Sequence, residues 1–201
     1  MELFLASNNG HKLEEFSDLL IEAGFALNLN SARVLGGMPE VDETAPDFEG
    51  NARLKAEALV GCIEPTAWVL ADDSGLEVDA LKGAPGVRSA RFAGEDATDG
   101  ANNAKLLKAL TAVEPSRRTA RFRCVLVLLS GTGELKTFSG SCEGQIGLVE
   151  KGTAGFGYDP LFIPDGYDRS FAELGSEIKQ QLSHRAKAFA SMVAWLRSEE
   201  G

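Results

Sequence analysis

Apolar and polar residues along this chain follow two periods, one typical of helices and one typical of strands. Apolar residues at helical spacing predict four helices. The expected helices are Lys12–Ala23, Phe48–Cys62, Asp99–Thr111 and a last one that begins near Ser183. Short apolar runs bounded by turn-forming residues predict strands. The expected strands are Glu2–Ala6, Phe25–Leu29, Ala67–Ala71, Leu76–Leu81, Thr119–Leu129, Glu134–Ser139, Gln145–Val149 and Leu161–Ile163.

Residues that favour turns separate these segments. Gly24 stands where the C-cap of the first helix belongs. The segment from Ser130 to Gly133 predicts a hairpin between two strands. Three stretches without a period are expected to be loops, namely residues 31–46, 83–98 and 151–160. Hairpins combined with strand–helix units predict a mixed sheet, in the α/β or α+β class.

Composition narrows the class of protein. A chain of 201 residues is long enough for one domain spanning residues 1–201, or for two closely packed lobes. The net charge of −10 argues against nucleic acid or an anionic membrane surface as a partner. Three cysteines without a CxxC pair indicate a reducing compartment. No signal peptide or bilayer-spanning run is evident, so we expect a cytoplasmic protein.

Two adjacent carboxylates, Asp72 and Asp73, end the apolar run that starts at Trp68. Acids at the end of a buried strand repel each other and lose hydration, so folding alone does not favour them. Ligands of open α/β sheets bind outside the carboxyl ends of the strands. The structural alternative is a turn formed with Ser74 and Gly75. The functional interpretation is a Mg²⁺ site in which one carboxylate also handles a proton.

The segment from Ser7 to Lys12 (SNNGHK) lies between the first strand and the first helix. Backbone N–H groups at a helix N-terminus, together with a hydroxyl, amides and a lysine, are suited to binding phosphate. The segment lacks the GxxxxGK[ST] pattern of a Walker A loop. The alternative is a simple N-cap, with Lys12 in solvent.

Two further segments carry groups suited to a nucleotide. Phe156 and Tyr158 stand among glycines, in a loop where an aromatic side chain could stack on a planar ring or instead fill the core. Lys179, His184 and Arg185 are expected at the start of the last helix. The helix dipole favours anions there, so a bound anion would explain the three cationic residues. The alternative is a solvated cationic face.

An acidic loop precedes the second helix and contains Glu40, Asp42 and Glu43. One of these carboxylates could complete a magnesium site with Asp73, although acidic loops are usually just solvated. Lys55 lies on the helix that follows and is a further candidate for contacting the substrate.

The motifs SNNGHK, ADDSGL, GAPGVRSARFAG, FGYDP and SHR occur in this order over nearly the whole chain. With all five, the chain resembles the inosine triphosphate pyrophosphatase family. The resemblance implies Mg²⁺-dependent hydrolysis of ITP, dITP or XTP to the nucleoside monophosphate and pyrophosphate. It also implies an elongated α/β fold of two lobes, with a central mixed, twisted sheet flanked by helices and a cleft between the lobes. Members are usually homodimers.

The resemblance also implies roles for individual residues. Asp73 would be the proton acceptor and a metal ligand, and Ser74 would contact the substrate. The expected phosphate-binding residues are Ser7, Asn8, Asn9, Gly10, His11 and Lys12. The expected base-binding residues are Phe156, Gly157, Tyr158 and Asp159, with Lys179, His184 and Arg185 completing the pocket.

The acidic loop departs from the family pattern. The family often has Glu-Glu-Thr-Gly where this chain has Asp42-Glu43-Thr44-Ala45. By position in that motif, Asp42 is favoured as the second metal ligand, with Glu40 as its rival.

Two other functions compete with this interpretation. A sensor could use the same phosphate-binding segment without turnover, but two extra negative charges at Asp72 and Asp73 would weaken triphosphate binding unless a metal were present. A phosphatase with an aspartyl-phosphate intermediate would need a DxDxT run at the first strand, which the sequence lacks.

Overall fold

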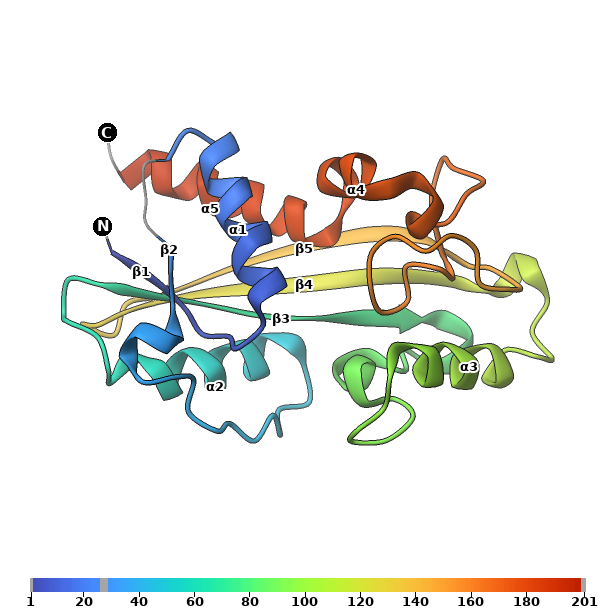
Figure 1. Cartoon of the computed structure of the whole chain (residues 1–201), viewed down its shortest axis with the longest axis horizontal. Helices are drawn as coiled ribbons and strands as arrows, with labels where there is room; N and C mark the ends of the chain where they lie inside the picture. The colour runs from blue at the N-terminus through green and yellow to red at the C-terminus, as the bar shows by residue number, and fades with distance from the viewer. Residues whose placement is uncertain (1, 26–28, 200–201) are drawn as a thin grey trace. The chain divides into compact units, whose positions relative to one another are not determined.

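The computed structural model describes residues 2–25 and 29–199, which contain a six-stranded sheet with helices packed on it (Figure 1). The strands are β1 Leu3–Leu5, β2 Leu29–Ser31, β3 Trp68–Val78, β4 Thr119–Ser130, β5 Leu135–Ile146 and β6 Phe162–Pro164. Their order in the sheet is β2-β1-β3-β4-β5-β6. β1 pairs in parallel with β2 and β3, whereas β5 and β6 are antiparallel. The prediction of a mixed α/β sheet is therefore confirmed.

The described residues also form five α-helices and four short 3₁₀ helices, of which α4 and α5 follow the last strand. The α-helices are α1 Gly10–Glu22, α2 Phe48–Val60, α3 Asp99–Ala109, α4 Phe171–Leu182 and α5 His184–Glu199. The 3₁₀ helices are η1 Ala32–Leu35, η2 Asp79–Leu81, η3 Gly86–Arg91 and η4 Pro115–Arg117. Within the described part of the chain, none of the helices is long and apolar enough to cross a membrane.

The chain divides into two compact units. The first unit contains Met1–Asp73, Val125–Ser139 and Ala188–Gly201, and the second contains Ser74–Cys124 and Gly140–Lys187. Strands β3, β4 and β5 therefore contribute residues to both units.

In the first unit, helices pack on both faces of the strands. Alanines and a leucine of α2 pack on Val69 and Val127, which are fully buried. On the other face α1 meets α5, where the rings of Phe16 and Phe189 lie 6.3 Å apart. Figure 1 shows α1 and α5 together on one side of the strands and α2 on the other. The small alanine side chains allow close helix–sheet packing, which holds α2 firmly beneath β3.

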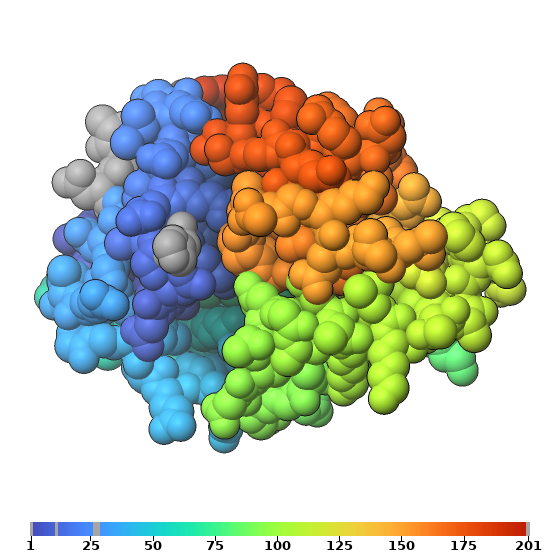
Figure 2. Space-filling model, turned by 45° about the vertical axis from the view of Figure 1, so that its right-hand side comes forward, coloured from blue at the N-terminus to red at the C-terminus, as the bar shows by residue number. Residues whose placement is uncertain are grey.

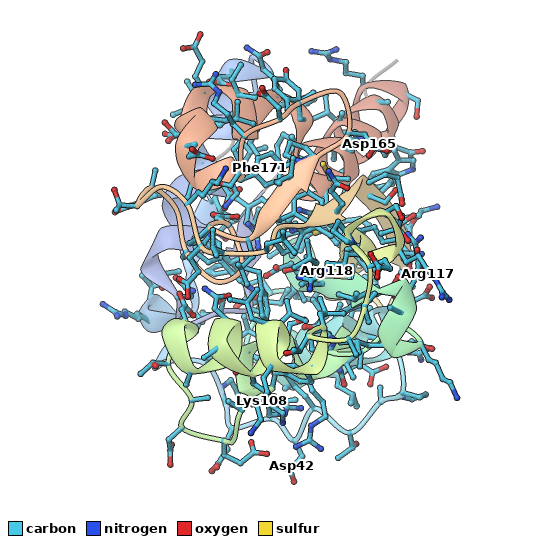
Figure 3. All side chains as sticks on the ribbon, turned by 90° about the vertical axis from the view of Figure 1, so that its right-hand side faces the viewer. Asp42, Lys108, Arg117, Arg118, Asp165 and Phe171 are labelled. Atoms are coloured by element: carbon cyan, nitrogen blue, oxygen red, sulfur yellow. The ribbon has the colours of Figure 1, made fainter. Side chains whose placement is uncertain are left out.

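In the second unit, α3, α4 and the segment before β6 share one apolar core. It combines Leu76, Phe122, Leu106, Tyr158 and Phe171, all of them buried. Figure 3 shows Phe171 of α4 directed into this core, and Arg118 inside the unit while Arg117 lies at its edge. The Arg118 guanidinium donates to the carbonyls of Leu110, Val113 and Gly147, which satisfies its buried charge with three acceptors.

The predicted helices are confirmed within a few residues. α1 begins at Gly10, two residues before the expected start, and Gly24 follows it with a φ of +77°. The Phe25 N–H donates to Leu20 O across that glycine, as expected for a left-handed C-cap. The hairpin between β4 and β5 is confirmed as well.

The expected break at Asp72 is wrong, because β3 runs without interruption from Trp68 to Val78. The predicted strand at Leu76–Leu81 is the end of this same strand, followed by the 3₁₀ turn η2. Polar side chains interrupt the apolar pattern here, yet each acid has a lysine partner, so the strand can continue. The turn alternative with Ser74 and Gly75 is also wrong.

Two other boundaries differ from the prediction. The strands expected at Glu134–Ser139 and Gln145–Val149 form the single strand β5. Gly144 lies within β5, where a Cβ would come within 2.3 Å of Ile163 O. This glycine therefore permits close pairing with β6, which itself lies one residue later than expected.

Helix α4 is absent from the prediction. Its signal is the capping box of Ser170 and Glu173, whose side chains bond each other's backbone N–H groups. Gly175, with a φ of +83°, interrupts the helix and obscures its period. The predicted strand Phe25–Leu29 falls largely on residues 26–28, which lie outside the described residues, and β2 begins at Leu29.

Candidate active site

In the first unit, polar side chains gather where β1 ends. Leu5 is the last residue of β1 and pairs with Leu70 of β3, and the chain then leaves the sheet toward α1. Asp72 lies two residues beyond that pair on β3. The rule that ligands bind outside the carboxyl ends of strands therefore applies to β1, although β3 itself continues.

Asp72 and Asp73 point to opposite faces of the sheet because they are neighbours on one strand. Lys12 of α1 bonds both carboxylate oxygens of Asp72, at 2.9 and 2.8 Å. Lys55 of α2 bonds Asp73 Oδ1 at 3.0 Å. The repulsion between Asp72 and Asp73 that the sequence suggests is therefore reduced in two ways. The two side chains point away from each other, and each is paired with a lysine. Lys12 is not simply in solvent, so the bare N-cap alternative does not describe it.

Glu43 and Asn51 complete this lysine–carboxylate cluster, which we define as Lys12, Glu43, Asn51, Lys55, Asp72 and Asp73. Lys55 Nζ lies 3.1 Å from a Glu43 oxygen, and Asn51 donates to Asp73 Oδ2 at 3.3 Å. The Asn51 side chain also accepts from Ala45 N–H, which ties the acidic loop to α2.

The electrostatics of the cluster favour a basic Asp73. Burial raises the pKa of the Asp73 carboxyl, although Lys55 opposes that rise. Burial alone would lower the pKa of Lys55, but the carboxylates of Asp73, Asp72 and Glu43 raise it overall. Lys55 therefore stays charged, while Asp73 is a stronger base than an exposed aspartate.

The structure brings Glu43 to this cluster, and not the two acids named from the sequence. Glu40 and Asp42 are exposed, and Figure 3 shows Asp42 at the outer edge. Glu43 belongs to the same acidic loop, but position in the family motif favours Asp42 as the metal ligand instead. The position of Glu43 follows from Asn51, which fixes the loop one turn of helix away from Lys55.

The donors of the cluster fit a magnesium ion. Mg²⁺ is usually bound by one or two carboxylates, with water and substrate phosphates filling its other positions. Among the described residues no group of three or more His, Cys, Asp or Glu side chains is arranged to hold a metal. Asp73 with one acid of the loop at residues 40–43 matches the smaller set that Mg²⁺ requires.

The segment from Ser7 to Lys12 forms the N-terminus of α1. Ser7 Oγ accepts from Asn9 N–H, and Asn9 Oδ1 accepts from Lys12 N–H at 3.4 Å. Asn8 Oδ1 accepts from the N–H of Met38. Asn8, Asn9 and Gly10 are exposed, and the side chain of His11 lies outside the described residues. An exposed helix start beside Lys12 is a suitable place for phosphate oxygens.

In the second unit, the two aromatic residues of the 151–160 loop have different roles. The Phe156 side chain is 49 % exposed, whereas Tyr158 is 4 % exposed and donates from its hydroxyl to Ser89 O. Tyr158 fills the core, as the alternative interpretation proposed, and only Phe156 has a ring available for stacking. Figure 2 shows this loop (orange) at the surface between α4 (red-orange) and the segment of α3 (green).

Lys179 and Asp159 organise the loop around Phe156. Asp159 is 1 % exposed, and its Oδ2 accepts from Phe156 N–H and from Lys179 Nζ. Burial raises the pKa of Asp159, while the Lys179 ammonium opposes the rise. Lys179 Nζ also lies 4.3 Å from the centre of the Phe156 ring, within the range of a cation–π contact.

Lys179 lies in the last turn of α4, so the expectation that it begins the last helix is wrong. A cation is favoured at a helix C-terminus, and the dipole argument for a bound anion does not apply to it. His184 and Arg185 do begin α5. The argument that the helix dipole favours a bound anion therefore applies only to His184 and Arg185.

His184 and Arg185 are both buried and differ in surroundings. The His184 ring is 4 % exposed and stacks on Phe122, with ring centres 4.9 Å apart. Arg185 donates to Ser74 Oγ at 3.1 Å, and its guanidinium carbon lies 5.8 Å from the centre of the Phe156 ring. Arg185 and Ser74 thus belong with Phe156 and Lys179, and we call these four residues the aromatic–cationic cluster.

Two residues of α3 that the sequence reasoning missed hold the same loop. Asp99 and Asn103 bond the backbone of Gly157. The available signal is a polar residue one turn before Leu106 and Leu107 on α3, and Asn103 is indeed only 2 % exposed.

These features define a class of α/β protein: a mixed sheet with one cluster suited to phosphates and a metal, and another suited to a planar, electron-rich ring. Comparison with known proteins identifies the family. The chain belongs to the Ham1 family, whose model matches residues 3–195. The family resemblance drawn from the five motifs is thereby confirmed.

Relatives and solved structures agree over nearly the full length. The chain is 50 % identical to the dITP/XTP pyrophosphatase of Opitutus terrae, over 98 % of this chain and 99 % of that protein. It is 43 % identical to the dITP/XTP pyrophosphatase of Bacillus subtilis, over 98 % of both chains. The structure of a HAM1 protein from Coxiella burnetii superposes with a TM-score of 0.90 at 36 % identity, covering 98 % of this chain and 99 % of that one.

Proposed function

We propose that this chain is a Mg²⁺-dependent pyrophosphatase of non-standard purine nucleoside triphosphates. Its substrates would be dITP, XTP and ITP, and its products the nucleoside monophosphate and pyrophosphate. Support comes from relatives up to half identical in sequence that are named dITP/XTP pyrophosphatases. The observation that carries the proposal is the buried Asp73 bonded to Lys55, beside a second lysine–carboxylate pair at the end of β1.

The two lysines are the proposed phosphate ligands. Lys12 and Lys55 are each bound to carboxylates in the first unit, and these contacts hold the ammonium groups in place before substrate arrives. A triphosphate carries several negative charges and competes well with a carboxylate for such groups. The exposed start of α1, with Ser7, Asn8, Asn9 and Gly10, would add backbone and side-chain donors.

Asp73 is the proposed general base of the reaction. Its raised pKa, caused by burial, brings its basicity closer to neutral pH, where a general base is most effective. Asn51 and Lys55 fix the two carboxylate oxygens, so one of them can accept a proton from an attacking water while the group stays oriented. Attack on the α-phosphorus would release pyrophosphate, whose charge the lysines stabilise.

The metal site is proposed at Asp73 with Glu43. Glu43 takes the place given to Asp42 or Glu40 from the sequence, because it bonds the same lysine as Asp73. When bound, Mg²⁺ would neutralise negative charge on the phosphate oxygens.

The aromatic–cationic cluster is the proposed base-binding site. Phe156 would stack on the purine, and Arg185 and Lys179 would donate to keto oxygens. Adenine lacks the 6-keto group, and a polar pocket rejects a ligand that leaves its donors unpaired. His184, buried against Phe122, would support Arg185 at the start of α5.

A sensor without turnover is the alternative function. The argument against it, that the two negative charges of Asp72 and Asp73 would weaken triphosphate binding without a metal, loses force because each carboxylate is paired with a lysine. A measurement of turnover distinguishes the pyrophosphatase from the sensor. Purified protein incubated with a panel of nucleoside triphosphates and MgCl₂, with pyrophosphate and orthophosphate measured separately, should give pyrophosphate from ITP, dITP and XTP. Orthophosphate as the first product would contradict the proposal, and no turnover would favour the sensor.

Action as a homodimer in the cytoplasm stays a prediction from the family resemblance.

A further inference from the structure

We propose that Asp99 and Asn103 of α3 are positioning residues, which hold Phe156 in place for base stacking and thereby set the KM for the nucleotide. This inference rests on the proposed function for the role of Phe156. It concerns a contact between α3 and the 151–160 loop, both within the second unit.

Both polar backbone groups of Gly157 are held from one face of α3. The Gly157 N–H donates to Asp99 Oδ2 at 2.6 Å, and Gly157 O accepts from Asn103 Nδ2 at 3.1 Å. The two side chains lie four residues apart, so they project from the same side of the helix. A rigid helix thus fixes both hydrogen-bonding groups of the residue next to Phe156.

The orientation of the Asn103 amide shows that its donors matter. Asn103 Nδ2 contacts Gly157 O and a Glu150 oxygen at 3.5 Å, whereas the buried Asn103 Oδ1 has no hydrogen-bond partner within the described structure. Turning the amide over would set its oxygen against those two acceptors. Two acceptors at the amide nitrogen therefore favour a side chain with two N–H donors at this position.

Phe156 is the group that this arrangement controls. Its neighbours are fixed on the other side as well, since Tyr158 bonds Ser89 O and Asp159 bonds Phe156 N–H. Gly157 has a φ of +61°, a conformation that glycine adopts at little cost. With its flanking backbone held, the half-exposed ring is presented to Lys179 and Arg185 without a large loss of entropy on binding.

The chain offers a matched control in Asn102. Asn102 is also 2 % exposed and also bonds two backbone groups, Ala90 O at 2.9 Å and Ala93 N–H at 2.7 Å, but in a different loop. Asn102→Ala and Asn103→Ala should therefore lose similar stability. Only the second should change the geometry of Phe156.

The test is steady-state kinetics with ITP on Asp99→Ala, Asp99→Asn, Asn103→Ala and Asn102→Ala. Asp99→Ala and Asn103→Ala should raise KM by roughly three- to tenfold, the effect of one net hydrogen bond, with little change in kcat. Asp99→Asn keeps an acceptor oxygen and should restore most of the affinity. Asn102→Ala should lower Tm as Asn103→Ala does, with KM changed by less than about twofold.

The decisive comparison places Asp99→Ala and Asn103→Ala in a Phe156→Ala background. If the two residues act through Phe156, they should raise KM no further there. A similar rise in both backgrounds, or an unchanged KM in the single variants, would overturn the inference.

A failure of the proposed function remains distinguishable from a failure of this inference. If the wild type hydrolyses no nucleoside triphosphate, the Kd for inosine monophosphate, measured by calorimetry, replaces KM in the same comparisons. Weaker binding in Asp99→Ala and Asn103→Ala, absent in the Phe156→Ala background, would still support positioning. Equal Kd values in all variants would overturn it.

Discussion

Replacing Asp73 by asparagine separates catalysis from folding. Asp73→Asn keeps the size of the side chain and an oxygen for Lys55, but it removes the negative charge and the basic oxygen. Loss of general-base catalysis lowers kcat by roughly 10²- to 10⁴-fold, and loss of a metal ligand adds to this. Lys55 keeps Glu43 as a partner, so its charge is not left alone in the first unit.

The stability of this variant follows from the raised pKa of Asp73. A carboxyl whose pKa is higher in the folded state contributes stability at acidic pH, below its unfolded pKa. That contribution is lost as the pH rises through the folded pKa. At neutral pH the ionised Asp73 therefore opposes folding, and Asp73→Asn should melt no lower than the wild type. Any gain in Tm of Asp73→Asn over the wild type should disappear as the pH is lowered, because Asp73 of the wild type then becomes protonated.

The assay measures kcat, KM and Tm for Asp73→Asn beside Glu49→Gln, which removes an exposed carboxylate from the same helix as Lys55. The control should keep full activity. In the wild type, kcat/KM should rise with pH across the raised pKa of Asp73, and the variant should lack this limb. Near-full turnover with an unchanged melting transition would show that Asp73 is not the base. Lost activity together with a lost transition would show a structural role instead.

Three further predictions concern recognition of the purine base and dependence on the metal. Phe156→Ala should raise KM by the equivalent of about 1–3 kcal/mol of lost stacking, and an unchanged KM would remove Phe156 from the base site. Arg185→Ala should lower the ratio of kcat/KM for ITP over ATP by roughly tenfold, since a discriminating hydrogen bond is lost; an unchanged ratio would place specificity in the backbone of the 151–160 loop. Chelation by EDTA should stop turnover and MgCl₂ should restore it, whereas activity that survives chelation would contradict metal dependence.

The fold could be predicted from the sequence wherever a period and its end signals agree. α1 has both an apolar face and Gly24 as its cap, and β4 contains the unbroken apolar run Cys124–Leu129, with a hairpin after the strand. Both were placed within two residues. α4 could not be found in this way, because Gly175 interrupts its period and the capping box at Ser170 was the remaining signal.

The site was harder to predict where partners are distant in sequence. Asp72 and Asp73 read as the end of a strand, because unpaired acids would end one, and Lys12 and Lys55 lie 60 and 18 residues from their partners. The family motif favours Asp42, but Ala45 N–H donates to Asn51 Oδ1, and in the loop held by this bond it is Glu43 that pairs with Lys55. Motifs located the parts of the site, but pairing between elements determines what each acid does.

The most direct test of the account is to follow isotope from solvent into the products. Wild-type protein, ITP and MgCl₂ are incubated in water enriched in ¹⁸O, and the products are identified by mass spectrometry. Attack of water on the α-phosphorus predicts inosine monophosphate that carries one ¹⁸O atom and pyrophosphate that carries none. Label in pyrophosphate, or release of orthophosphate with inosine diphosphate, would contradict the proposed reaction.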